Sequence, residues 1–118
     1  MAHKGYTLNY FIDFFSEIPN SRFIEGELLD SDGVKMCALG HAGAASRNPD
    51  AFAGADTCDI SGLPTEARAE ALENFLGDTA SINDGNGDYS SLGKTPRTRI
   101  LRALRNRKRT GNALGITE

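Results

Sequence analysis

Three side chains of this sequence have the types that nucleophilic catalysis needs: Cys37, His41 and Asp84. A cysteine nucleophile is activated by a nearby imidazole, which a carboxylate in turn orients. Cys37 and His41 are four residues apart, so a helix would place them on one face. Catalytic pairs of this kind usually come from separate elements, and i, i+4 residues are more often plain neighbours. We therefore expect a buried, inert thiol and a capping or surface histidine, with a small hydrolase using Cys37, His41 or the Asp84 loop as the alternative function.

A second candidate is the turn at residues 83–88, where Asp84, Asn86 and Asp88 alternate as oxygen ligands do in calcium loops. The sixth position of such a loop is Tyr89 where an EF-hand needs Gly, and the twelfth is Thr95 where it needs Glu. We expect no metal here. Asn83 and Asp84 are instead expected to be structural, with the Asp84 carboxylate capping or bracing the loop before Thr95.

The third candidate site is a set of basic side chains near the end of the sequence. Eight of the 13 Lys and Arg residues fall in 94–109, on a segment that reads as one helix. An outer row at i, i+3 and i+7 is formed by Arg102, Arg105 and Arg109. Arginine forks suit phosphate or carboxylate groups, so the expected partner-binding residues are Arg99, Arg102, Arg105, Lys108 and Arg109. The alternative is a solvated helix that balances the acidic body and pairs with Glu residues of a helix over 65–76.

The charge is unevenly distributed along the chain. Residues 1–93 hold 15 Asp and Glu against five Lys and Arg, a formal −10, while residues 94–118 carry +7. Proteins that bind nucleic acid tend to be basic as a whole, and this chain has a net charge of −3. We expect no specific DNA binding. The expected partner is a host protein or a nucleotide-like anionic ligand. A homo-oligomer is a further alternative.

Hydrophobic periodicity predicts the elements that position these residues. Amphipathic helices are expected over 7–18, over 65–76 with Thr65 as its N-cap, and from Thr95 to about 109. Residues 22–29 and 34–39, across an Asp-Gly turn, predict a β-hairpin. The alternative is that the second arm leaves the strand early and becomes a helix near Met36, which the small residues of 37–45 favour. Residues 46–64 read as a loop with one helical turn near 51–55, and 78–93 as a 16-residue loop. The fold class is α+β: a mostly helical single domain over 1–118 with a small β-hairpin and a frayed tail from about 111.

The bulk composition is that of a soluble globular domain, with 39% hydrophobic and 25% charged residues. No apolar run is long enough to span a membrane, and the first residues lack the apolar stretch of a secretory signal. In a chain without an export signal, Cys37 and Cys58 are expected to be reduced thiols. The expected location is the cytoplasm, that of the host cell if the protein is phage-encoded.

Short motifs follow one another after the N-terminal helix: Met36-Cys-Ala-Leu-Gly-His-Ala-Gly-Ala-Ala45, then Ile82-Asn-Asp84, then Thr95 ahead of Arg99-Ile-Leu-Arg-Ala-Leu104. This order resembles an uncharacterised family of small actinobacterial and phage proteins with a Cys-x-x-Gly-Ala segment, a Trp-Asn-Asp motif and a Thr-led helix. His41 stands where the family tends to Ala, and Ile82 where it tends to Trp. The resemblance implies an architecture and a structural role for Cys37, Asn83 and Asp84. It implies no activity.

The function we expect is a small non-enzymatic binding protein, without a cofactor, that docks on or inhibits a host protein or sequesters an anionic ligand. A phage origin is compatible with the size of the chain and its solitary domain. Phage proteins of this kind are often inhibitors or sequestering modules aimed at host machinery, host defence included.

Overall fold

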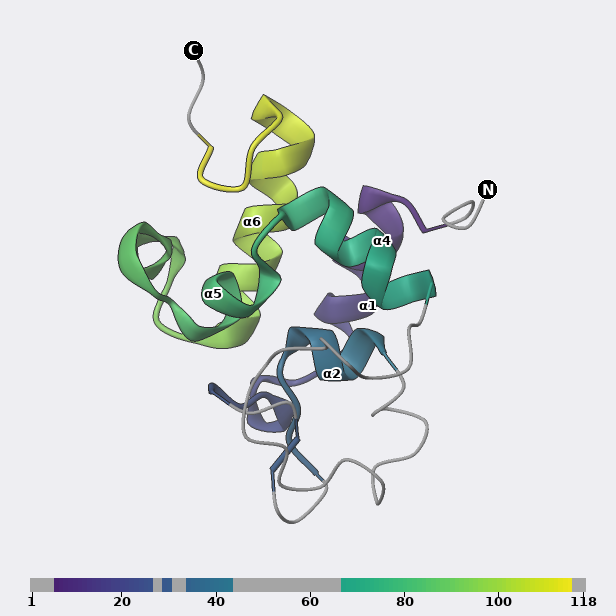
Figure 1. Cartoon of the computed structure of the whole chain (residues 1–118), viewed down its shortest axis with the longest axis vertical. Helices are drawn as coiled ribbons and strands as arrows, with labels where there is room; N and C mark the ends of the chain where they lie inside the picture. The colour runs from purple at the N-terminus through teal and green to yellow at the C-terminus, as the bar shows by residue number, and fades with distance from the viewer. Residues whose placement is uncertain (1–5, 27–28, 31–33, 44–66, 116–118) are drawn as a thin grey trace.

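Helices make up all the regular elements of the described chain (Figure 1). The structure is a computed structural model that describes residues 6–26, 29–30, 34–43 and 67–115. In chain order the elements are α1 (Leu8–Ser16), the 3-10 turn η1 (Asn20–Arg22), α2 (Ala38–Ala42), α4 (Ala67–Leu76), α5 (Thr79–Asp84), the 3-10 segment η3 (Gly87–Leu92) and α6 (Pro96–Thr110). The mostly helical single domain is confirmed. The described residues contain no β-strand.

The last helix, α6, is the element around which the others pack, since it contacts α1, α4, α5 and η3. It begins as predicted: the Thr95 hydroxyl oxygen accepts a hydrogen bond from the Thr98 N–H at 3.2 Å, and Pro96 occupies the first turn. Gly111, in the left-handed region at φ +90°, ends it. Its inner face is buried and comprises Ile100, Leu101, Ala103 and Leu104.

The N-terminal helix supplies the aromatic part of the core. Thr7 caps α1 by accepting a hydrogen bond from the Tyr10 N–H at 3.1 Å. Phe11 and Phe15, one helical turn apart, are fully buried. Phe11 also meets Phe75 of α4 edge to face, with ring centroids 6.2 Å apart. The helix α1 packs mainly against α6, and Phe11 of its predicted apolar stripe also reaches α4.

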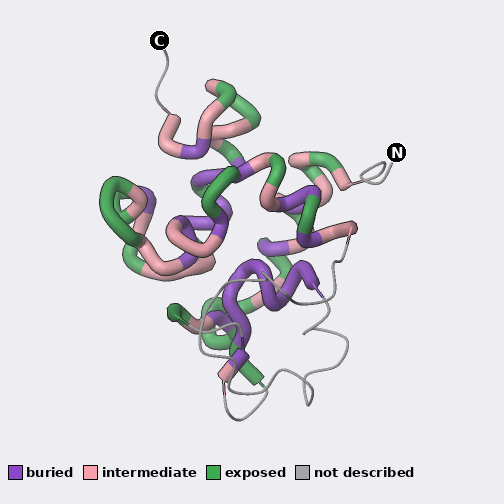
Figure 2. The backbone as a smooth tube through the Cα atoms, in the orientation of Figure 1, coloured by how far each residue is buried: buried purple, intermediate pink, exposed green. Residues whose placement is uncertain are grey.

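The short helix α2 is buried along its whole length (Figure 2). Its small residues allow this, because they let neighbouring backbones approach closely. A Cβ atom on Gly43, which ends α2, would lie 3.0 Å from the Leu39 carbonyl oxygen and 3.5 Å from the Cβ of Ala69 in α4. Glycine is therefore needed here for the close contact between α2 and α4.

The predicted β-hairpin is not found among the described residues, which do not include 27–28 and 31–33. Met36 instead forms two isolated bridges, a parallel one with Phe23 and an antiparallel one with Leu29. The Met36 N–H donates to the Arg22 carbonyl at 3.0 Å, and the Met36 carbonyl accepts from the Ile24 N–H at 3.2 Å. A hairpin needs an antiparallel ladder that continues from its turn. Here α2 begins at Ala38, directly after this pairing, so the second arm has no length in which to form a strand.

The predicted 16-residue loop over 78–93 is wrong, because it contains α5 and η3. The Asp78 carboxylate caps α5 by accepting from the Ser81 N–H. The Glu73 carboxylate of α4 accepts from both the N–H and the hydroxyl of Thr79, at 2.9 and 2.5 Å. Gly85 ends α5 at φ +71°. A six-residue helix is too short to show a hydrophobic period, so side-chain caps determine this segment.

The chain beyond α6 remains packed where it is described. Ala113 is buried, and its carbonyl accepts a hydrogen bond from the Asn106 side-chain amide at 3.0 Å. The tail therefore does not fray at 111–115, and residues 116–118 lie outside the described residues. The predicted turn at 51–55 and the Thr65 cap also lie outside them. In the described part of the chain, no helix has the length and apolar character needed to cross a membrane.

Candidate functional site

The arginine expected to begin the partner-binding set, Arg99, is an interior residue. Its side chain is 4% exposed. Its guanidinium donates to the carbonyls of Ile82, Asn83 and Gly93 at 2.6–3.2 Å and forms an ion pair with Glu25. The structure thus separates Arg99 from the surface set, because its charge already satisfies the carbonyl end of α5 and the turn before α6.

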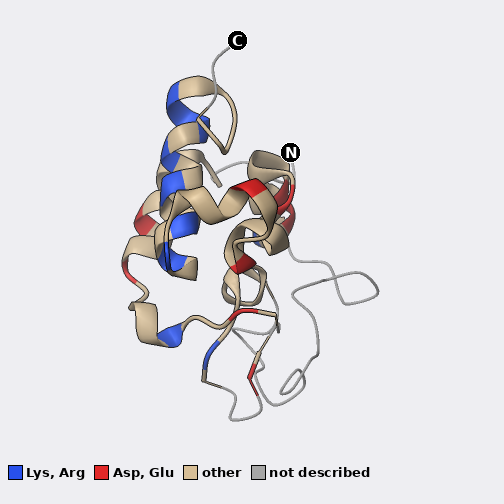
Figure 3. Cartoon of the chain, turned by 90° about the vertical axis from the view of Figure 1, so that its left-hand side faces the viewer, with Lys and Arg blue, Asp and Glu red and all other residues tan. Residues whose placement is uncertain are grey.

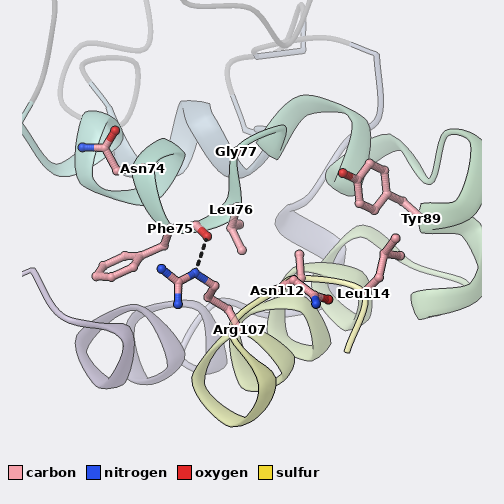
Figure 4. A pocket seen from close by; sticks show the side chains of 10 residues that line it. Asn74, Phe75, Leu76, Gly77, Tyr89, Arg107, Asn112 and Leu114 are labelled. Atoms are coloured by element: carbon pink, nitrogen blue, oxygen red, sulfur yellow. Dashed lines mark hydrogen bonds between the residues drawn. The ribbon is translucent and has the colours of Figure 1, made fainter. Parts of the chain in front are cut away.

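Two further arginines of α6 bind the carbonyl ends of other helices. Arg97 donates to the carbonyls of Ser16 and Ile18 at the end of α1, both at 2.9 Å. Arg107 donates from Nε to the Phe75 carbonyl at the end of α4, at 3.2 Å (Figure 4). Cations stabilise helix C-termini because the last carbonyls lack partners and carry partial negative charge. Sequence reasoning missed these roles, since no local pattern shows which arginine meets a distant helix end.

The other basic residues of α6 face solvent and form the surface set, namely Arg102, Arg105, Lys108 and Arg109. Figure 3 shows the Lys and Arg positions, in blue, following one another along the ribbon of α6. Lys108 donates to the Asn9 side chain at 2.7 Å, and Arg109 donates to the Asn106 side chain at 3.0 Å. The structure therefore brings together four of the five expected partner-binding residues on one exposed face.

A hollow of about 370 Å³ lies on this face of α6. Its walls are formed by Arg97, Thr98, Leu101, Arg102, Arg105 and Asn106. Among the residues that the structure describes, neither Arg102 nor Arg105 forms an ion pair. Two exposed guanidinium groups one helical turn apart thus have no described counter-charge. We call this feature the arginine hollow.

A second hollow of about 370 Å³ lies between the end of α4, η3 and the end of α6 (Figure 4). Phe75, Tyr89, Arg107, Asn112 and Leu114 are among its lining residues. The Nε of Arg107 is bound to the Phe75 carbonyl. Two helix C-termini also border this hollow and lower the local potential. It is therefore a weaker site for an anion than the arginine hollow.

Cys37 is disulfide-bonded and fully buried. The expected reduced thiol is therefore wrong for Cys37, and Cys58, the other cysteine of the sequence, lies outside the described residues. A sulfur in a disulfide cannot form the thiolate that attacks a substrate. The hydrolase based on a Cys37 nucleophile therefore has no nucleophile in this structure.

His41 is also an interior residue, at 6% exposure. Its Nε2 lies 2.8 Å from the Arg22 carbonyl, which can only accept, so Nε2 carries the hydrogen and donates. Burial lowers the pKa of His41, and the hydrogen bond to Arg22 offsets part of that shift. The imidazole lies against Phe23, with ring centroids 4.9 Å apart and the rings tilted by 57°, so His41 is a core residue and not the expected surface or capping group.

Asn83 and Asp84 connect α5 to the segment before α2. The Asn83 side-chain oxygen accepts from the Ala38 N–H at 3.0 Å, and its amide donates to the Ile24 carbonyl at 2.9 Å. The Asp84 carboxylate accepts from the Gly26 N–H at 2.9 Å and from the Asn83 amide. Asp84 thus braces Gly26 and not the loop before Thr95, because α5 carries it toward the N-terminal part of the chain.

The alternating residues Asp84, Asn86 and Asp88 do not form a calcium loop. Asp84 ends α5, and Asp88 lies in the 3-10 segment η3. Within the described ranges, no three His, Cys, Asp or Glu side chains lie where they could share a metal ion.

Comparison with protein-family models, with curated proteins and with solved structures finds no match to this chain.

Proposed function

We propose that the protein is a non-enzymatic binding module that holds an anionic partner on the exposed face of α6. The observation that carries this proposal is the arginine hollow, in which Arg102 and Arg105 are exposed and have no ion pair within the described residues. Arginine presents a planar fork of donors that fits carboxylate and phosphate groups. A partner with such groups would supply the charge that this face lacks.

The energetics of α6 favour binding over simple solvation. Arg102 and Arg105 are three residues apart, a spacing at which like charges repel by about 0.2–0.5 kcal/mol. The alternative, that α6 is balanced by pairing with acids of α4, finds little support. Glu73 of α4 is bonded to Thr79, and Arg107 contacts α4 through the Phe75 carbonyl. An uncompensated face that slightly destabilises the fold is more readily explained by a partner.

The rest of the chain limits the kind of partner. The formal −10 of residues 1–93 opposes a long polyanion such as duplex DNA, because the net negative charge of the chain repels it. The proposed partner is therefore a protein with an acidic surface or a small anionic ligand. If the resemblance to phage proteins holds, the partner is a host protein, and binding inhibits it. The partner can also be a second copy of the chain, in which case acidic residues of one copy bind α6 of the other and form a homo-oligomer.

No observation favours the alternative hydrolase. The sulfur of Cys37 is bonded, His41 donates to a backbone carbonyl, and the Asp84 carboxylate holds the Gly26 N–H. The cytoplasmic location expected from the sequence remains a proposal. The disulfide at Cys37 favours an oxidising compartment instead, since cytosolic thiols are mostly kept reduced.

The test compares capture of partners by wild type and by a variant in which Arg102, Arg105, Lys108 and Arg109 are all replaced by Gln. Both proteins are immobilised and exposed to host lysate, and to a glutamate-rich peptide, over a salt series. We expect salt-sensitive capture by wild type and none by the folded variant. Equal capture by the two proteins would leave the face of α6 as solvated surface.

A further inference from the structure

We propose that the arginine hollow binds a phosphoryl dianion, an inference that rests on the proposed function and names the ligand class for the same face. The described residues that line the hollow include three arginines and no acid. Its volume of about 370 Å³ is at the lower end of the range for small-molecule sites. The hollow is thus large enough for a single anionic group with a small body.

One wall of the hollow is preorganised. The Arg97 side chain is fixed by hydrogen bonds from Nε to the Ile18 carbonyl and from Nη2 to the Ser16 carbonyl, both at 2.9 Å. Its Nη1 makes no hydrogen bond to a described residue. An arginine that is already held loses little further rotamer freedom when a ligand arrives. Arg97 therefore offers a charged donor at low entropic cost.

The other two guanidinium groups are uncommitted. Arg102 and Arg105 are exposed and lie one helical turn apart on the same side of α6. Neither makes a hydrogen bond or ion pair to the rest of the described chain. Thr98 adds a neutral donor: its oxygen accepts from the Thr95 hydroxyl at 2.9 Å, which leaves the Thr98 hydrogen available.

The number of donors and charges distinguishes a phosphoryl group from a carboxylate. A carboxylate carries one charge and two oxygens, which a single arginine fork satisfies. A phosphate monoester carries about −1.5 to −2 at pH 7 and three strong acceptor oxygens. Three guanidinium groups and a hydroxyl around one hollow match the charge and the acceptor oxygens of a phosphate monoester. The group is either a free phosphate or phosphomonoester, or a phosphorylated side chain of a protein partner.

The experiment measures binding to the full chain by NMR titration and calorimetry, at constant ionic strength set with NaCl. The probes are inorganic phosphate, sulfate and acetate. We expect phosphate and sulfate to bind more tightly than acetate at pH 7.5. Lowering the pH to 5.5 should weaken phosphate, which becomes a monoanion, and leave sulfate unchanged.

Matched variants locate the site. Arg102→Gln and Arg105→Gln should each weaken phosphate about tenfold or more, the scale of a lost charged hydrogen bond. Lys35→Gln removes one positive charge from an exposed residue outside α6 and outside the lining of the hollow, and should change affinity less than twofold. Circular dichroism of each variant establishes that it is folded. An equal loss in all three variants, or equal binding of acetate and phosphate, would overturn the proposal.

Peptide titrations then distinguish a small phosphate ligand from a phosphorylated protein partner. They also distinguish the phosphoryl site from the more general proposed function of anion binding. Tighter binding of a phosphoserine peptide than of inorganic phosphate assigns the group to a protein partner, and equal binding assigns it to a small phosphate ligand. If a glutamate peptide binds through Arg102, Arg105 and Arg109 alike while phosphate shows no preference, the phosphoryl site is wrong and the proposed function stands. If no anion binds, both are wrong.

Discussion

The side-chain oxygen of Asn83 accepts a hydrogen bond from the backbone N–H of Ala38 at 3.0 Å, across 45 positions of the sequence. A residue of α5 thereby satisfies a free N–H group at the start of α2. The same amide donates to the Ile24 carbonyl at 2.9 Å. One fully buried side chain therefore links α5, α2 and the segment after η1.

Replacing Asn83 by Ala should destabilise the protein by about 2–4 kcal/mol, because the buried Ala38 N–H and the partly buried Ile24 carbonyl would lose their partner. Chemical denaturation measures this change. Asn86→Ala is the matched control, since Asn86 is exposed and its side chain makes no hydrogen bond to the described residues. Similar midpoints for the two variants would remove the structural role assigned to Asn83.

Arg99→Lys should destabilise the fold by about 2–4 kcal/mol although it preserves the charge, because one ammonium cannot reach the three carbonyls and Glu25 that the guanidinium joins. Arg102→Lys, the same change on the exposed face, should stay within about 0.5 kcal/mol of wild type. Thermal and urea unfolding compare the pair. A mild effect at Arg99 would mean that its internal contacts contribute little.

His41 should make stability depend on pH. Burial lowers the pKa of His41 in the folded state, so the unfolded chain binds the proton more readily. Stability should therefore be highest above the ordinary value of about 6.5 and fall as the pH drops from there through the folded-state pKa. Melting temperatures from pH 8 to 5 check this. His41→Gln should lose this part of the pH dependence.

The disulfide at Cys37 should contribute to stability. Reduction, or Cys37→Ala, is expected to cost about 2–5 kcal/mol, because a cross-link restricts the unfolded chain. Mass spectrometry with and without alkylation establishes the oxidation state, and calorimetry in the presence of a reductant measures the loss. An unchanged melting temperature after complete reduction would show that the disulfide does not stabilise the fold. The protein would then be stable in a reducing compartment as well.

The double variant Arg102→Gln with Arg105→Gln should separate folding from binding. Its unfolding free energy should stay within about 0.5 kcal/mol of wild type or rise slightly, because the substitutions relieve repulsion between like charges. Its capture of anionic partners should be lost. A marked loss of stability would show that these arginines serve the fold, as Arg97, Arg99 and Arg107 do.

The elements predicted correctly from sequence are those whose signals are local. The Thr95-Pro96 start of α6 and the Phe11 and Phe15 stripe of α1 follow from capping rules and from the 3.6-residue period. The outward row of Arg102, Arg105 and Arg109 follows from the same period, and all three are exposed. Helical geometry alone fixes these features, so neighbouring residues suffice to predict them.

The features that sequence reasoning missed depend on contacts between distant residues. Whether Arg99 faces solvent or the core depends on the carbonyls of α5, which a helical wheel does not contain. The β-hairpin does not form among the described residues for the same reason, since Met36 pairs with two residues of the first expected arm, Phe23 and Leu29, in opposite senses. Short helices such as α5 are stabilised by side chains elsewhere, Glu73 among them. Propensity and periodicity carry no information on such pairings.

The arginines of α6 also determine the order in which this domain can mature during synthesis. A ribosome releases α1, α4 and α5 before α6, yet the carbonyl ends of all three helices are satisfied by Arg97, Arg107 and Arg99. A nascent chain that has not yet exposed α6 therefore carries three helices with open ends and an uncovered core. Folding of this domain is therefore complete only after α6 has emerged, because α6 supplies partners for three earlier helices.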